Sequence, residues 1–133
     1  MKESLKAGIA TTRAFEVDRS RTIGFMGDEG RVYATPAMIM DIEITARDLI
    51  KEHLDDGEDT VGTHVSVDHL AATIEGDTAV VTITVTEVDG RAVTVEASVK
   101  DSLEDVGRGI HKRFIVDTAK TFERLKAKQA KLG

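Results

Sequence analysis

The pattern of apolar and polar positions divides the chain into a short strand, a long loop, a long helix and a run of strands. Residues 9–17 alternate weakly and predict a first strand, whereas residues 18–34 carry three glycines and no clear period. A helix is predicted from Pro36 to about His53, because Thr35 followed by Pro36 is a typical N-cap and first helical residue. The apolar stripe of this helix contains Ile39, Ile42, Ala46, Leu49 and Ile50.

The chain beyond this helix alternates between apolar and polar residues until near its end. Strands are predicted at 60–73, 78–88, 91–99 and 106–116, and a charged, mostly exposed helix at 118–131. We expect the strands to form an antiparallel meander that covers the central helix. The pattern therefore predicts an α+β fold in one domain, residues 1–133, with one sheet wrapped around one long helix. Cystatin-like and cone-shaped α+β folds satisfy the same pattern.

Charge and cysteine content exclude several classes of function. The formal net charge of −6 disfavours a nucleic-acid-binding protein, which needs a basic surface. No apolar run reaches the roughly 20 residues of a membrane span. The chain contains no cysteine, which excludes disulfides, cysteine-ligated metals and a thiol nucleophile. No histidine has the spacing of a metal ligand, so no metal or other cofactor is expected. The absence of a signal-peptide pattern favours a cytoplasmic location.

Three polar residues occupy positions that the pattern reserves for apolar ones or for a helix start. Glu43 falls in the apolar stripe of the central helix, and His69 shares a strand face with Val65, Val67 and Ala71. A buried carboxylate or imidazole costs free energy unless it is paired, so Glu43, His69 and Thr35 are candidate site residues. The alternative is a satisfied core histidine and a carboxylate that reaches water or an arginine.

Other polar residues near these positions have simpler interpretations. Asp41 lies on the opposite, polar face of the helix and is predicted to be exposed. His64 lies on the other strand face from His69 and is also predicted to be exposed. His111, on the last strand between Gly109 and Arg113, fits either a core or a site position.

These residues resemble the motifs of the hot-dog-fold acyl-CoA thioesterases, in particular the fluoroacetyl-CoA thioesterase type. Thr35 precedes Glu43 by eight positions at the start of the central helix, as in that family. The strand motif Gly-Thr…Val-x-His-x-Ala-Ala-Thr is matched from Gly62 to Thr73, and Gly-x-Gly-x-His-x-Arg from Gly107 to Arg113. The similarity extends from about Val32 to Phe122, and it implies a hot-dog fold.

The resemblance also implies roles for individual residues. Thr35, Glu43 and His69 would form the catalytic set, Gly62 would offer a backbone N–H to the thioester oxygen, and Arg113 would contact the substrate or coenzyme. Thioester hydrolysis needs a nucleophile or an activated water, and Glu43 can serve in either way. The family works as a homodimer with the site at the subunit interface, and we expect the same here.

The expected function is therefore hydrolysis of a short- or medium-chain acyl-CoA, with coenzyme A as part of the substrate. Selectivity for fluoroacetyl-CoA is not assigned, because the segment before Thr35 matches no aromatic lid. The alternative is a non-catalytic acyl-CoA or small-ligand binding protein; a hydratase is disfavoured, because no histidine precedes His53 in the helix. Basic residues that could meet the anionic coenzyme are Arg108, Lys112, Arg113, Lys120, Arg124, Lys126 and Lys128.

Overall fold

The computed structural model describes all 133 residues and contains five strands and two α-helices. In chain order they are β1 (Ala10–Glu16), α1 (Thr35–Lys51), β2 (Glu58–His69), β3 (Thr78–Asp89), β4 (Ala92–Lys100), β5 (Asp105–Asp117) and α2 (Thr118–Leu132). Each predicted strand and helix is confirmed. The segment between β1 and α1, predicted as a loop, contains two single-turn 3₁₀ helices, η1 (Arg19–Arg21) and η2 (Asp28–Gly30). Neither α-helix has the length and apolar content needed to cross a membrane.

The strands form one antiparallel sheet in the order β1-β3-β4-β5-β2. The predicted meander is wrong at one point, because β2 pairs with β5 and not with β3. The physical reason is burial: β3 and β4 hide every second side chain and occupy inner positions, whereas most of β2 is exposed and suits an edge. The second edge of β2 has no partner strand in the chain.

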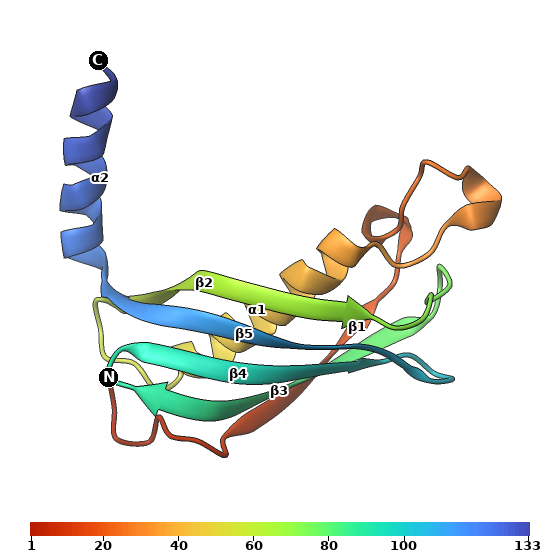
Figure 1. Cartoon of the computed structure of the whole chain (residues 1–133), viewed down its shortest axis with the longest axis horizontal. Coiled ribbons are helices and arrows are strands. Elements are labelled where there is room, and N and C mark those ends of the chain that lie inside the picture. Colours follow the sequence, from red (N-terminus) through yellow and green to blue (C-terminus); the bar gives the residue numbers. More distant parts are fainter.

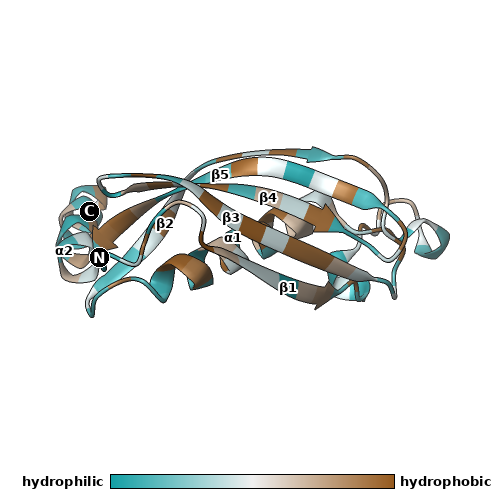
Figure 2. Cartoon of the chain, turned by 90° about the horizontal axis from the view of Figure 1, so that it is seen from below, coloured by the Kyte–Doolittle hydropathy of each residue, from teal (hydrophilic) through white to brown (hydrophobic).

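Helix α1 lies across one face of the sheet, and the core forms between them (Figure 1). The alternation of hydrophobic and polar residues along the strands is visible in Figure 2, as the period-two pattern requires. The helix contributes Met38, Ile42, Ala46, Leu49 and Ile50, which are all buried. Burial of each of the Met, Ile and Leu side chains contributes about 1.5–3 kcal/mol to folding, so this layer holds the helix on the sheet.

The apolar stripe of α1 is rotated relative to the predicted one. Asp41 is only 2% exposed, whereas the Glu43 side chain is 40% exposed, so both burial predictions are wrong. The reason is that Met38 belongs to the buried face, which moves the centre of the stripe toward Asp41 and away from Glu43. The helix start also differs, because Ala34 is the N-cap residue and Thr35 is already helical.

Asp41 anchors the segment between β1 and α1 to the helix. Its carboxylate accepts a hydrogen bond from the Tyr33 hydroxyl at 2.5 Å and pairs with Arg21, whose Nε lies 3.1 Å away. The hydrogen bond to Asp41 raises the pKa of the Arg21 guanidinium. Burial and then the same carboxylate raise the pKa of the Tyr33 hydroxyl, which stays protonated as a donor. The buried charge is thus satisfied, as its location demands.

We predict that Asp41→Ala lowers the free energy of unfolding by about 3 kcal/mol, because Tyr33 and Arg21 lose their common acceptor. Urea denaturation measures the change. Asp48→Ala is the matched control, since Asp48 lies on the same helix in an exposed ion pair with Arg13, and it should cost at most about 1 kcal/mol. Equal losses in the two variants would contradict the anchoring role of Asp41.

Candidate active site

The first group of candidate residues is the Thr35–His69 pair, which joins the first residue of α1 to the last residue of β2. Thr35 Oγ1 lies 2.7 Å from His69 Nδ1. His69 Nε2 is buried and has no hydrogen-bond partner in the chain. Burial lowers the pKa of His69, which favours the neutral imidazole. The free Nε2 can therefore exchange a hydrogen bond with a molecule bound beside it.

A largely apolar pocket of about 400 Å³ opens beside the Thr35–His69 pair. Its other walls are Ile23, Phe25, Val32, Tyr33, Leu70, Ala71 and Ala72. The Tyr33 ring stands edge-on to His69 with ring centroids 6.3 Å apart, and its hydroxyl is held by Asp41. Asp41, which anchors the segment before α1, thus also fixes the Tyr33 ring that stands beside His69. Such a pocket suits a small apolar group with a polar atom directed at His69.

The second group is the Glu43 cluster, formed by Glu43, Gly62, His111 and Arg113. Glu43 Oε1 lies 3.8 Å from Arg113 Nη1 and 3.9 Å from His111 Nε2. His111 Nδ1 lies 2.8 Å from the His64 carbonyl oxygen, which can only accept, so Nδ1 carries the proton. His111 Nε2 then accepts from Arg113 Nη1 at 3.1 Å. Burial and the charge of Arg113 lower the pKa of His111 below its ordinary value, although the hydrogen bond to the His64 carbonyl opposes them.

Arg113 is only 8% exposed, although the family resemblance implied that it contacts the substrate or coenzyme. Its Nε donates to Thr60 Oγ1 at 2.7 Å and its Nη2 to the Thr60 carbonyl at 2.9 Å. Burial lowers the pKa of this guanidinium, and the Glu43 carboxylate opposes that effect. Arg113 therefore presents only Nη1 toward Glu43.

Gly62 lies directly against the Glu43 carboxylate. A Cβ atom at this position would lie 2.6 Å from Glu43 Oε1 and 3.3 Å from the His111 ring, so the absence of a side chain permits the contact. Glu43, Gly62 and Arg113 line a cleft of about 540 Å³. Phe122, Thr118 and Thr121 of α2 line the same cleft. The Glu43 carboxylate is thus held in place while one side of it faces open space.

The two groups do not meet within one chain. Thr35 and Glu43 belong to the same helix and are eight residues apart, which separates them by about 12 Å along its axis. The structure brings Thr35 to His69, and Glu43 to Gly62 and Arg113, but it does not join the two sets. No group of three or more His, Asp or Glu side chains lies together as a metal site would require.

Three residues that lie beside the candidate site residues were not assigned to the site from the sequence. His111 had been left open between core and site, and it is 1% exposed beside Glu43. Tyr33 and Asp41 had not been assigned to the site at all. Met38 could have indicated the burial of Asp41, because the two residues are three positions apart on the helix and Met38 therefore places Asp41 at the edge of the buried stripe. The prediction that His64 is exposed is confirmed.

Comparison with known proteins gives consistent relatives. Residues 17–119 match the FlK family model, described as fluoroacetyl-CoA-specific thioesterase. The fluoroacetyl-CoA thioesterase of Streptantibioticus cattleyicolor is 29% identical over 127 residues, which cover 90% of this chain and 91% of the relative. The matched region contains both groups of candidate residues.

Solved structures agree with this match. The structure of the fluoroacetyl-CoA thioesterase FlK superposes with a TM-score of 0.84 at 27% identity, covering 93% of this chain and 97% of that chain. A thioesterase superfamily member from Thermus thermophilus gives 0.82 at 27% identity, covering 93% and 95%. A hot-dog-like protein from Thermanaerovibrio acidaminovorans gives 0.85 at 24% identity, covering 92% and 91%, and shows the shared fold. This chain therefore has the hot-dog fold and belongs to the fluoroacetyl-CoA-specific thioesterase family.

Proposed function

We propose that the protein is a thioesterase that hydrolyses a short- or medium-chain acyl-CoA to the free acid and coenzyme A. The observation that carries this proposal is the unpartnered Nε2 of His69 in an apolar pocket of about 400 Å³. A thioester has two groups that match this pocket: an apolar acyl chain that fits its apolar walls, and a carbonyl oxygen that can accept a hydrogen bond from His69 Nε2. The family supports the same substrate class, since relatives have been crystallised with acetyl-CoA and with fluoroacetate and CoA.

We further propose that the protein acts as a homodimer through the free edge of β2. An unpaired strand edge is a template for another strand, and this strand also exposes Val61 and Val65. Antiparallel pairing of two β2 strands about a point between Val65 and Ser66 sets Gly62 of one copy opposite His69 of the other. The Glu43 cluster of one subunit then faces the Thr35–His69 pair of its partner, and the dimer has two complete sites.

In this arrangement each residue has a chemical task. Glu43 either attacks the thioester carbonyl and displaces the coenzyme A thiolate, leaving an anhydride that water hydrolyses, or takes a proton from a water that attacks the carbonyl and displaces the same thiolate. The thiolate leaves as the free thiol after it takes up a proton. The Gly62 N–H and His69 Nε2 are the proposed donors to the oxygen that becomes negative. Thr35 fixes the orientation of the His69 ring through its 2.7 Å hydrogen bond. Arg113, which also hydrogen-bonds to His111, holds the Glu43 carboxylate beside Gly62 through its positive charge.

A non-catalytic acyl-CoA-binding or small-ligand-binding protein is the second candidate function. It would use the same apolar pocket, and the exposed Glu43 carboxylate is the observation that favours catalysis over it. Ligand binding alone does not require a half-exposed Glu43 carboxylate that lies beside Arg113 and against Gly62. Hydrolysis of the thioester separates the two functions.

We predict that the protein releases thiol from acyl-CoAs of short and medium chain, and that Glu43→Gln removes most of the turnover. The amide keeps the shape of the side chain but cannot act as nucleophile or base, so the fold is expected to remain. A chromogenic thiol reagent measures hydrolysis, and thermal melting on the same preparation checks folding. Full activity in folded Glu43→Gln would refute the role of Glu43; an inactive wild type that still binds acyl-CoA would favour the binding function.

The two histidines of β2 give a matched pair of variants. We expect His69→Ala to lower the hydrolysis rate about 10²–10⁴-fold, the range of a lost acid, base or positioned donor. His64→Ala removes an exposed ring from the same strand and should leave the rate within about twofold of wild type. The assignment of His69 is contradicted if both variants lose activity to the same small extent.

Stability should fall on mild acidification because His69 and His111 both have lowered pKa values in the folded state. Below the ordinary histidine pKa of about 6.5 the unfolded chain takes up protons that the folded chain resists, so stability is lost as the pH falls. We predict a lower melting temperature at pH 5.5 than at pH 7.5. His111→Asn should reduce this difference, whereas His64→Asn should not. An identical pH dependence in all three proteins would contradict the prediction.

A further inference from the structure

Helix α2 leaves the body of the molecule, and only its first residues lie beside the cleft of the Glu43 cluster. It extends from the end of β5 past the free edge of β2 (Figure 1), and none of its 15 residues is buried. An exposed helix of this length is only marginally stable in water, so its order calls for a packing partner. One stripe repeats at spacings of three and four residues, as in a helix that packs on another surface. The stripe contains Phe122, Leu125, Gln129 and Leu132.

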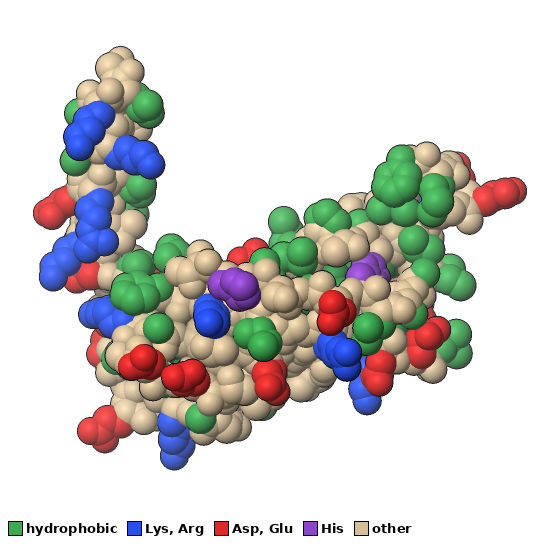
Figure 3. All heavy atoms as spheres, viewed as in Figure 1, with side chains coloured by type: hydrophobic (Ala, Val, Ile, Leu, Met, Phe, Trp, Pro, Cys, Tyr) green, Lys and Arg blue, Asp and Glu red, His purple; other side chains and the backbone are tan.

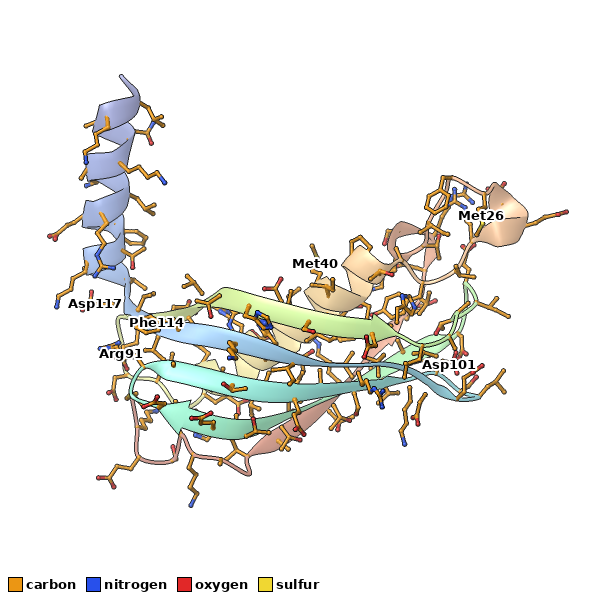
Figure 4. The ribbon with its side chains drawn as sticks, in the orientation of Figure 1. Met26, Met40, Arg91, Asp101, Phe114 and Asp117 are labelled. Atoms are coloured by element: carbon orange, nitrogen blue, oxygen red, sulfur yellow. The ribbon has the colours of Figure 1, made fainter.

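The opposite end of the molecule exposes a second apolar surface, which we call the loop-end patch. It consists of Phe25, Met26, Leu70, Ile74 and Leu103 from three loops. Phe25 is 83% exposed and Leu103 is 82% exposed, which is unusual for residues of their size. Met26 and Asp101 mark this end in Figure 4, far from Asp117, where α2 begins. The stripe and the patch therefore cannot meet within one chain.

The charges of the two surfaces are complementary. From Thr118 to the end, the chain holds five of its 18 Lys and Arg residues but only one of its 24 Asp and Glu residues. Figure 3 shows these basic side chains along α2 and hydrophobic side chains over the loops at the other end. The loops of the patch also expose Glu29, Glu75 and Glu104, and no salt bridge within the chain involves any of the three. A basic helix with an apolar stripe thus fits an acidic end with an apolar patch.

We propose that α2 is a strap that packs on the loop-end patch of a second copy of the chain. The inference rests on the proposed dimer, because antiparallel pairing of two β2 strands brings opposite ends of the two subunits together. Helix α2 extends beyond the β2 edge into the space that the second copy would occupy (Figure 1). The patch includes Phe25 and Leu70, which line the pocket of the Thr35–His69 pair. The strap therefore covers the outside of the pocket of its partner.

The absence of native cysteine makes a cross-linking test direct. Leu125→Cys and Ile74→Cys are made as separate proteins, mixed, and oxidised mildly. The strap predicts a covalent species of twice the chain mass in the mixture on a non-reducing gel, above the level given by either protein alone. Ala127→Cys mixed with Ile74→Cys is the matched control, since Ala127 lies on the opposite side of α2. Equal cross-linking from Leu125→Cys and Ala127→Cys overturns the proposal.

A second measurement separates the strap from the dimer. The double variant Phe122→Ser/Leu125→Ser should raise the dissociation constant of the dimer at least about tenfold, because two apolar side chains per subunit lose their contact. Sedimentation measures the constant, and circular dichroism checks the fold of the body. Glu123→Ser/Ala127→Ser, on the opposite side of α2, is the control. A dimer of unchanged affinity overturns the strap alone, whereas a monomeric wild type overturns the proposed dimer and the strap with it.

Discussion

The burial of one stripe of α1 against the curved sheet is the constraint from which the rest of the structure follows. Successive helical residues are rotated by 100°, so Asp41 and Glu43 emerge on opposite flanks of the buried stripe. Asp41 faces the segment before the helix and ties it down through Tyr33 and Arg21. Glu43 faces the edge strand β2 and its neighbour β5, where it lies beside Gly62 and Arg113. The rotational phase of the helix thus sets the positions of both the Asp41 and the Glu43 carboxylates.

The same helix also explains why the candidate site is divided. Its rise of about 1.5 Å per residue keeps Thr35 and Glu43 apart in any chain with this fold. β2 runs alongside the helix, with Gly62 in the Glu43 cluster and His69 in the Thr35–His69 pair. Within one chain the cluster and the pair therefore lie at different points along the same strand. In the proposed dimer, a two-fold axis at the edge of β2 would bring the two groups together without any change within the subunit. The free edge of β2 and the separation of the two groups therefore both follow from the way β2 runs along α1 at the edge of the sheet.

Much of this architecture could be predicted from the sequence, because periodicity reports which face of an element is buried. The alternation of β2 distinguished His64 from His69 correctly, and Pro36 located the start of α1 to within one residue. Periodicity does not report which strands are neighbours, so the position of β2 at the edge beside β5 was missed. Asp41 was predicted to be exposed because the apolar stripe was drawn without Met38, which left Asp41 on the polar face of the helix. Its burial depends on Tyr33 and Arg21, which approach it only in the folded chain.

The anchoring of the segment before α1 divides the molecule into parts that can change independently. The walls of the pocket beside His69 include Ile23 and Phe25 on this segment, whereas Glu43, Gly62, His111 and Arg113 lie on the helix and the sheet. Because Asp41 fixes the segment through Arg21 and Tyr33, side chains on the segment's surface can vary in size while the Glu43 cluster keeps its geometry. Within a lineage, the shape of this pocket can therefore change by substitution in one loop without disturbing the packing of the helix on the sheet.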